Sequence, residues 1–95
     1  MSFPVARLGD KCSGHGCFPP RQNIEASNSV FINGKGAHRQ GDAYETHCCG
    51  DSCHDSVLAQ GSSKTYVNGK PLGRVTDPVA CGSMVAQGSP NVFSG

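Results

Sequence analysis

The chain is organised by a six-residue phrase that occurs twice, as VFINGK at residues 30–35 and as TYVNGK at residues 65–70. β-Branched and aromatic residues favour strands, and Asn-Gly after such a run is a strong signal for a two-residue hairpin turn with positive φ at both central positions. The phrase therefore predicts hairpin turns at Asn33-Gly34 and Asn68-Gly69. The first three residues of each copy are predicted to form the strand that enters the turn.

A second phrase, Arg-x-x-Asp, follows each predicted hairpin and also occurs near the N-terminus, so that its copies begin at Arg7, Arg39 and Arg74. Residues 89–93, SPNVF, repeat the start of the unit. The sequence thus predicts three imperfect units, the last cut short. We expect the Arg and Asp side chains to form surface ion pairs of little energetic worth, and His38 to be a structural or surface residue.

The predicted fold class is all-β, with short strands and hairpins. No window of the sequence shows apolar residues at a sustained helical period, and Gly or Pro interrupts almost every ten residues. Residues 11–23 and 43–55 are polar and are predicted to be loops. They hold most of the His and Cys residues, and loops without a core of their own need another source of order.

Composition limits the possible functions. The 95 residues are expected to form one domain, 1–95, whose apolar content is small: it includes no Trp and only six aromatic residues. A net charge of +1 argues against a nucleic-acid partner or an anionic membrane. The N-terminus lacks the pattern of a signal peptide, which predicts synthesis in the cytoplasm.

The repeat predicts a metal site. His15, His47 and Cys81 each follow the Asp of their own unit by four or five residues, so three units around a pseudo-threefold axis would bring these side chains together. Structural zinc requires four ligands, from imidazole and thiolate groups, and His54 is the unmatched candidate for the fourth. We expect one structural zinc ion per chain, in a closed His3Cys site.

The other five cysteines leave alternatives open, because they could supply a different ligand, bind a second metal or form disulfides: Cys12, Cys17, Cys48, Cys49 and Cys53. A disulfide-stabilised secreted binding module or toxin is one alternative function. A zinc hydrolase is another, although four protein ligands would close the site and no acidic general base stands beside the cluster in a recognisable motif. No small-molecule substrate is expected.

The phrase NGKPLGRVTD at residues 68–77 resembles the repeated phrase of the PAAR-repeat proteins, which are named after Pro-Ala-Ala-Arg. PVAR at residues 4–7 and GAHR at residues 36–39 are further copies, and GSPNV at residues 88–92 matches the Gly-Ser-Pro-x-Val of that family. The chain departs from the family pattern in that no copy is a literal PAAR and Thr76 stands where Gly is usual.

The resemblance implies a small conical domain that caps the blunt end of a trimeric β-helical spike, one copy per trimer, in a type VI secretion system or a contractile phage tail. Such a protein forms the membrane-piercing tip, touches the target membrane only transiently and is delivered outside the cell. The family's apical zinc, held by three His and one Cys, maps onto His15, His47, His54 and Cys81. The base of the cone would pair with the spike by strand addition. With no extension after Gly95, we expect a bare tip without enzymatic activity.

Overall fold

The computed structural model describes residues 2–95, which contain strands, turns and loops but no helix. The predicted all-β fold is therefore confirmed. The strands form four antiparallel pairs, β1–β8, β2–β3, β4–β5 and β6–β7. Their bounds are β1 (Phe3–Pro4), β2 (Phe31–Ile32), β3 (Lys35–Gly36), β4 (Ala43–Cys49), β5 (Ser52–Val57), β6 (Tyr66–Val67), β7 (Lys70–Pro71) and β8 (Phe93–Ser94).

Both predicted Asn-Gly hairpins are present. Asn33 and Gly34 connect β2 to β3 with φ values of 55° and 77°, and Asn68 and Gly69 connect β6 to β7 with φ values of 54° and 78°. These positive values are those that the two-residue turn requires. The entering strands are shorter than predicted, because Val30 and Thr65 lie outside the ladders.

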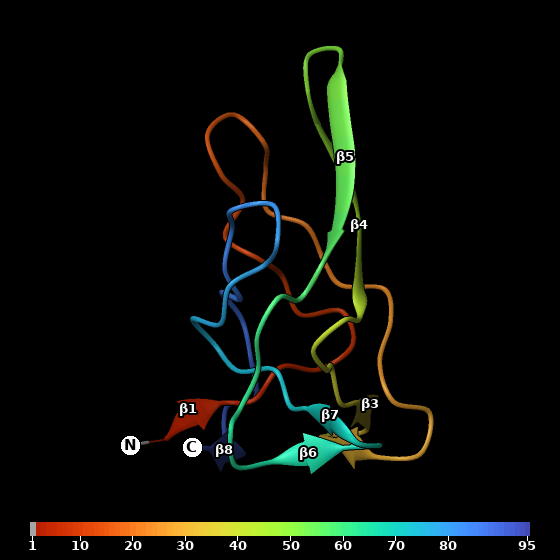
Figure 1. Cartoon of the computed structure of the whole chain (residues 1–95), viewed down its shortest axis with the longest axis vertical. Helices are drawn as coiled ribbons and strands as arrows, with labels where there is room; N and C mark the ends of the chain where they lie inside the picture. Colours follow the sequence, from red (N-terminus) through yellow and green to blue (C-terminus); the bar gives the residue numbers. More distant parts are fainter. Residues whose placement is uncertain (1) are drawn as a thin grey trace.

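The two ends of the chain form a third strand pair of the same length. Phe3 lies opposite Ser94, and Pro4 lies opposite Phe93. The last unit is therefore completed by the N-terminal strand, although the sequence makes it look truncated. Figure 1 shows that this pair and the two Asn-Gly hairpins lie together at one end of the molecule, which we call the base.

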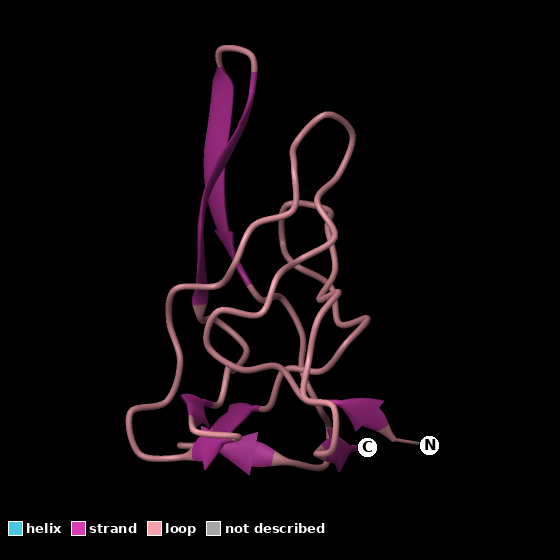
Figure 2. Ribbon diagram, turned by 180° about the vertical axis from the view of Figure 1, so that it is seen from behind, coloured by secondary structure: helices cyan, strands magenta, loops and turns pink. Residues whose placement is uncertain are grey.

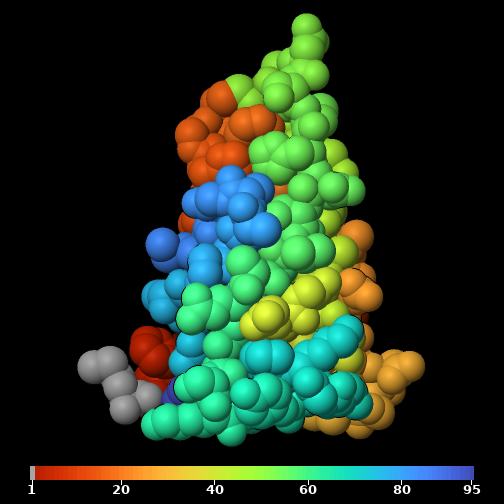
Figure 3. All heavy atoms as spheres, viewed as in Figure 1, coloured from red at the N-terminus to blue at the C-terminus, as the bar shows by residue number. Residues whose placement is uncertain are grey.

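The molecule measures 38 × 27 × 21 Å and narrows from the base to the opposite end, which we call the apex (Figure 3). The prediction that residues 43–55 form a loop is wrong, because they lie in the long hairpin β4–β5, which projects to the apex (Figure 2). Tyr44 and His47 are buried along β4, and Gly50, with a φ of 62°, lies in the turn. Residues 11–23 form a loop, as predicted.

The three Arg-x-x-Asp copies fold alike and are not the surface ion pairs that we expected. In each copy the backbone N–H and Nε–H of Arg donate to one carboxylate oxygen, and Nη2 donates to the other, at 2.7–3.0 Å. All three carboxylates are buried. Because each carboxylate also accepts a backbone N–H, it must lie inside the turn, which takes it out of water.

The three units meet in a closed triangle of backbone hydrogen bonds. Ala6 donates to the carbonyl of Gly73, Gly73 donates to that of His38, and His38 donates to that of Ala6, at 2.8, 2.9 and 3.1 Å. His38 is fully buried, so it is a structural residue. These repeated contacts support the predicted pseudo-threefold arrangement of the units.

The described residues form two small apolar clusters. One is made of residues in, or directly after, the base strands: Val5, Ile32, Ala37, Val67 and Leu72. The other contains Ala6, Cys12, Tyr44, Leu58, Val79 and Val85. The described residues include no helix of the length and apolarity needed to cross a membrane.

Candidate metal centre

The structure brings the four predicted ligands together below the apex. The ligand atoms of His15, His47, His54 and Cys81 all lie within 4.8 Å of one another. They come from separate parts of the chain: a loop, strand β4, strand β5 and the turn that follows Val79. A cation held by these four side chains would connect all of these segments.

The hairpin β4–β5 sets two of the four side chains. His47 and His54 are direct partners across the two strands, so their rings lie on the same face of the hairpin, and their Nε2 atoms are 2.8 Å apart. The register of the ladder shifts between Tyr44 and His47. Such irregularities re-aim side chains, and here Tyr44 lies in the apolar cluster while His47 faces the centre.

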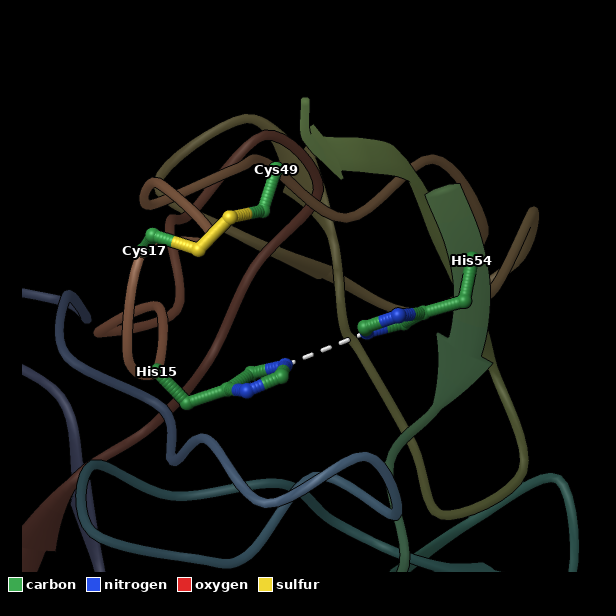
Figure 4. Close-up of a disulfide and its surroundings, with 4 residues drawn as sticks. All are labelled: His15, Cys17, Cys49 and His54. Atoms are coloured by element: carbon green, nitrogen blue, oxygen red, sulfur yellow. Dashed lines mark hydrogen bonds between the residues drawn. A yellow bond between two sulfur atoms is a disulfide. The ribbon is translucent and has the colours of Figure 1, made fainter. Parts of the chain in front are cut away.

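A tight turn sets the third imidazole. The backbone groups of His15 and Phe18 exchange two hydrogen bonds, at 3.1 and 2.8 Å. Gly14, just before this turn, combines a φ of 72° with backbone of Phe18 and Pro19 so close that a Cβ atom would overlap it. Figure 4 shows the ring of His15 pointing at that of His54, and their Nε2 atoms are 3.1 Å apart.

The hydrogen bonding of His47 fixes which of its nitrogens can bind a metal. Its Nδ1 lies 2.8 Å from the carbonyl of Pro19, and a carbonyl can only accept, so Nδ1 carries the proton and the Nε2 lone pair of the neutral ring faces the centre. Two nitrogens of a tetrahedral zinc site are about 3.3 Å apart, given bonds of about 2.0–2.1 Å. The Nε2 atom of His54 lies 2.8 Å from that of His47 and 3.1 Å from that of His15, so both separations are somewhat shorter than this value.

The thiol of Cys81 lies in an environment that favours its charged form. Burial by itself raises the pKa of this thiol, but hydrogen bonds from the backbone and hydroxyl of Ser83 and from Arg21 outweigh that effect and lower the pKa to about 6. The Nη2 of Arg21 is 3.2 Å from Sγ. These contacts favour the thiolate, which is the form that binds metals.

Two residues around the centre were not predicted from the sequence. The ring of Phe18 packs against all three imidazoles, with centroid distances of 4.8 Å to His15, 4.9 Å to His47 and 4.4 Å to His54. Arg21 is buried, and its Nε and Nη1 have no hydrogen-bond partner among residues 2–95. Its Nη2 donates to the Cys81 sulfur, where a thiolate would compensate the positive charge. Neither residue belongs to the repeated phrases from which the ligands were predicted. The only sequence feature that could have pointed to either of them is that Phe18 lies three residues after His15.

The remaining cysteines divide into three groups. Cys12 is free and fully buried in the apolar cluster, so it is a core residue. Cys17 and Cys49 form a disulfide that fastens the loop of His15 to the end of β4 (Figure 4). Cys48 and Cys53 form a second disulfide across the hairpin β4–β5. The disulfides thus use four of the five remaining cysteines, and none of the four predicted metal ligands takes part in them.

Comparisons with known proteins identify the family. The family model described as the PAAR motif matches residues 19–87. The chain is also 33% identical over 78 residues to the NAD(P)(+) glycohydrolase toxin Tse6 and to the (p)ppApp synthetase toxin Tas1, both from Pseudomonas aeruginosa, and 34% identical over 74 residues to the double-stranded DNA deaminase toxin A from Burkholderia cenocepacia.

These matches cover 74–76% of this chain but only 18%, 18% and 5% of the respective relatives. The chain thus corresponds to a small part of each toxin. Because the family model spans most of the chain, and because the resemblance rested on the repeated phrases of all three units, the chain belongs to the PAAR motif family.

Proposed function

We propose that this chain is the structural tip of a secretion spike. It caps the blunt end of a trimeric β-helical spike of a type VI secretion system, one copy per trimer, and is delivered outside the cell that makes it. The observation that carries the proposal is the contrast between the two ends of the molecule: three similar strand pairs form the base, and four side chains that could hold a metal ion lie together near the apex. That the relatives are bacterial toxins favours a secretion system over a phage tail.

The base suits a threefold partner although it belongs to a single chain. A trimer presents three equivalent strand ends, and a monomer can meet them equally only if it offers three similar edges. The pairs β1–β8, β2–β3 and β6–β7 supply these edges. Strand addition relies on main-chain hydrogen bonds, so the edges can engage equivalent strands even where their side chains differ.

The apex needs cross-links because it has little interior to pack. We propose that His15, His47, His54 and Cys81 hold one zinc ion, which supplies four bonds in a volume too small for an apolar core. The set matches zinc because it combines a thiolate with Nε2 atoms that face one another. Four protein ligands leave no open position for a substrate, so the ion has a structural role. The two disulfides fasten the same region.

Co-purification tests the proposed function. The chain is mixed with candidate β-helical spike trimers, and the complex is scored by native mass spectrometry for one copy per trimer. Elemental analysis of the same preparation should give about one zinc per chain. Failure to bind any of a panel of such trimers, or a ratio of three copies per trimer, would contradict the proposal.

A further inference from the structure

The base carries three exposed aromatic side chains at matching positions. Phe31, Tyr66 and Phe93 are the first residues of β2, β6 and β8, and their exposed fractions are 61%, 58% and 53%. Their cross-strand partners are a glycine or a proline in every pair, Gly36, Pro71 and Pro4, so no long neighbouring side chain covers the ring.

The alternation within these strands shows that the aromatic position is not required by the core. The residue after each aromatic, Ile32, Val67 or Ser94, is buried. Ile32 and Val67 belong to an apolar cluster, and the hydroxyl of Ser94 donates to that of Thr65. The outward position would be polar in a strand that faced only water. Three of the six aromatic residues of the chain are instead placed outward, once in each unit. Repeated exposure of large apolar groups marks an interaction surface.

Charge is distributed unevenly between the two ends of the molecule. Lys35, Lys64 and Lys70 are exposed on or beside the base strands, and only Lys70 approaches a carboxylate, that of Asp42 at 4.0 Å. Glu45, Asp51 and Asp55 belong to the apical hairpin and its turn, and Asp10, Asp42 and Asp77 are buried in their Arg pairs. Glu25 is exposed but lies outside the base strands, and it accepts a hydrogen bond from the backbone of Ala43. Among the described residues, the exposed charged side chains on or directly beside the base strands are therefore lysines.

We propose that Phe31, Tyr66 and Phe93 are three equivalent anchors, each of which enters an apolar recess in one chain of the trimeric spike, and that acidic residues of the spike surround these recesses. This inference rests on the proposed function and names the side chains that carry the binding energy of the base. Threefold repetition selects a trimer over a second copy of this chain, because a dimer would meet the three anchors unequally. Aromatic anchors in recesses dominate the affinity of protein interfaces, and complementary charge speeds association.

The test uses a spike trimer that retains the wild-type chain. We expect Phe31→Ser, Tyr66→Ser and Phe93→Ser each to weaken binding by about tenfold, by similar factors because the positions are equivalent, and the triple variant to lose measurable binding. Met84→Ser is the matched control: Met84 is 47% exposed but lies outside the base strands, and its substitution should leave affinity unchanged. Raising the salt concentration should slow association, and Lys35→Glu should reduce that dependence.

The outcomes separate the two proposals. If the wild-type chain binds the trimer and the triple variant binds equally well, the anchors are wrong and the proposed function stands. If the wild-type chain binds no trimer, both fail. Sedimentation measures self-association, and flotation with vesicles of anionic phospholipid measures membrane binding. If the triple variant lost either of these but kept trimer binding, the aromatic surface would belong to that other partner, and this inference would be overturned. Circular dichroism and metal content should be unchanged in every variant.

Discussion

Arg39 and Asp42 are joined by three hydrogen bonds, of 2.9 Å from the backbone N–H, 2.8 Å from Nε and 3.0 Å from Nη2, and the carboxylate is fully buried. Burying an ion pair costs desolvation energy, so the intact pair adds little net stability, but removing one partner leaves an unpaired buried charge and is strongly destabilising. Because all three units contain the same pair at different degrees of burial, the effect of burial can be tested by comparing them.

Asp42→Asn should lower the free energy of unfolding by about 3 kcal/mol, because it leaves the Arg39 guanidinium short of its counter-charge in a buried place. Asp77→Asn is the matched control, since Arg74 and Asp77 are more exposed, at 16% and 6% of their side-chain surface against 11% and 0% for Arg39 and Asp42. Its loss should be smaller. Urea unfolding followed by circular dichroism measures both, and equal losses would contradict the role of burial.

Thr76→Gly should stabilise the protein by about 1 kcal/mol. Thr76 has a φ of 81°, whereas Gly9 and Gly41, at the same place in the other two units, have φ values of 89° and 90°. A β-branched residue is strained in this region, and glycine is not. Thermal unfolding measures the gain, and Thr76→Ala should give a smaller one because a Cβ atom remains.

Gly41→Thr supplies the reverse test. No atom lies within 4 Å of a Cβ placed on Gly41, so the expected loss of about 1–3 kcal/mol would come from backbone strain alone. If Gly41→Thr were neutral, the positive φ would carry no cost here, and the gain predicted for Thr76→Gly would have no basis.

The sequence predicts those parts of this protein that repeat or that follow from local turn chemistry. Asn33-Gly34 and Asn68-Gly69 require no distant contact to form their turns, and the offsets of His15, His47 and Cys81 were visible because the units match. The hairpin β4–β5 was missed because its polar residues show no clear alternation, and it is held by a disulfide and by cross-strand histidines. Neither of these contributes to strand propensity.

Two other features could not be read from the sequence because they depend on packing between units. Each Arg of the buried Arg-x-x-Asp pairs directly follows one member of the closed triangle of Ala6, His38 and Gly73, and these members are far apart in the chain. Arg21 gains its role from Cys81, sixty residues away. Spacing within one segment carries no information on either.

Arg21→Met should weaken metal binding by about tenfold to a hundredfold, the range found when a group that supports a ligand is removed. The variant loses the donor 3.2 Å from the Cys81 sulfur and the positive charge beside it. Competition with a chromophoric chelator at pH 7.5 measures the affinity. Arg21→Lys keeps the positive charge and should recover part of the lost metal affinity. An affinity unchanged in Arg21→Met would show that Arg21 serves only to pack against Tyr44.

Acid should destabilise the protein partly through His38. Burial lowers the pKa of His38, and its Nδ1 donates to the Glu25 carbonyl at 2.8 Å while Nε2 has no partner within residues 2–95. Since the folded protein binds this proton less well than the unfolded chain does, stability is intact above the ordinary His pKa of about 6.5 and falls as the pH drops below it. His38→Gln cannot titrate.

The measurement is the difference between wild-type protein and His38→Gln in the free energy of unfolding from pH 7.5 to pH 5. The other ionisable groups are the same in both proteins, so their contributions largely cancel in the difference. The wild-type protein should lose more stability than the variant across this interval. Parallel curves would mean that His38 accepts its proton in the folded state as readily as in the unfolded chain.

His54→Ala and Cys81→Ser should each abolish stoichiometric zinc and lower the Tm by at least about 15 °C, because structural zinc contributes more than 4 kcal/mol and each kcal/mol shifts the Tm of a domain this size by about 4–8 °C. His38→Gln, which removes a histidine outside the centre, should retain the metal. Elemental analysis and calorimetry measure both quantities, and a variant that lost His54 but kept a full zinc ion would require a different ligand set.

The disulfides decide how far the apex opens without metal. Cys17–Cys49 and Cys48–Cys53 fasten the loop of His15 and both strands of the apical hairpin, so a chelator alone should loosen the centre without releasing the hairpin. Chelator and reductant together should lower the Tm by more than the sum of their separate effects, because each cross-link still restrains the apex when the other is removed.

Thiol titration tests whether the disulfides are present. In the oxidised, unfolded, metal-free chain, it should find two thiols, Cys12 and Cys81, and six after reduction. Six thiols before reduction would leave the metal as the sole fastening of the apex.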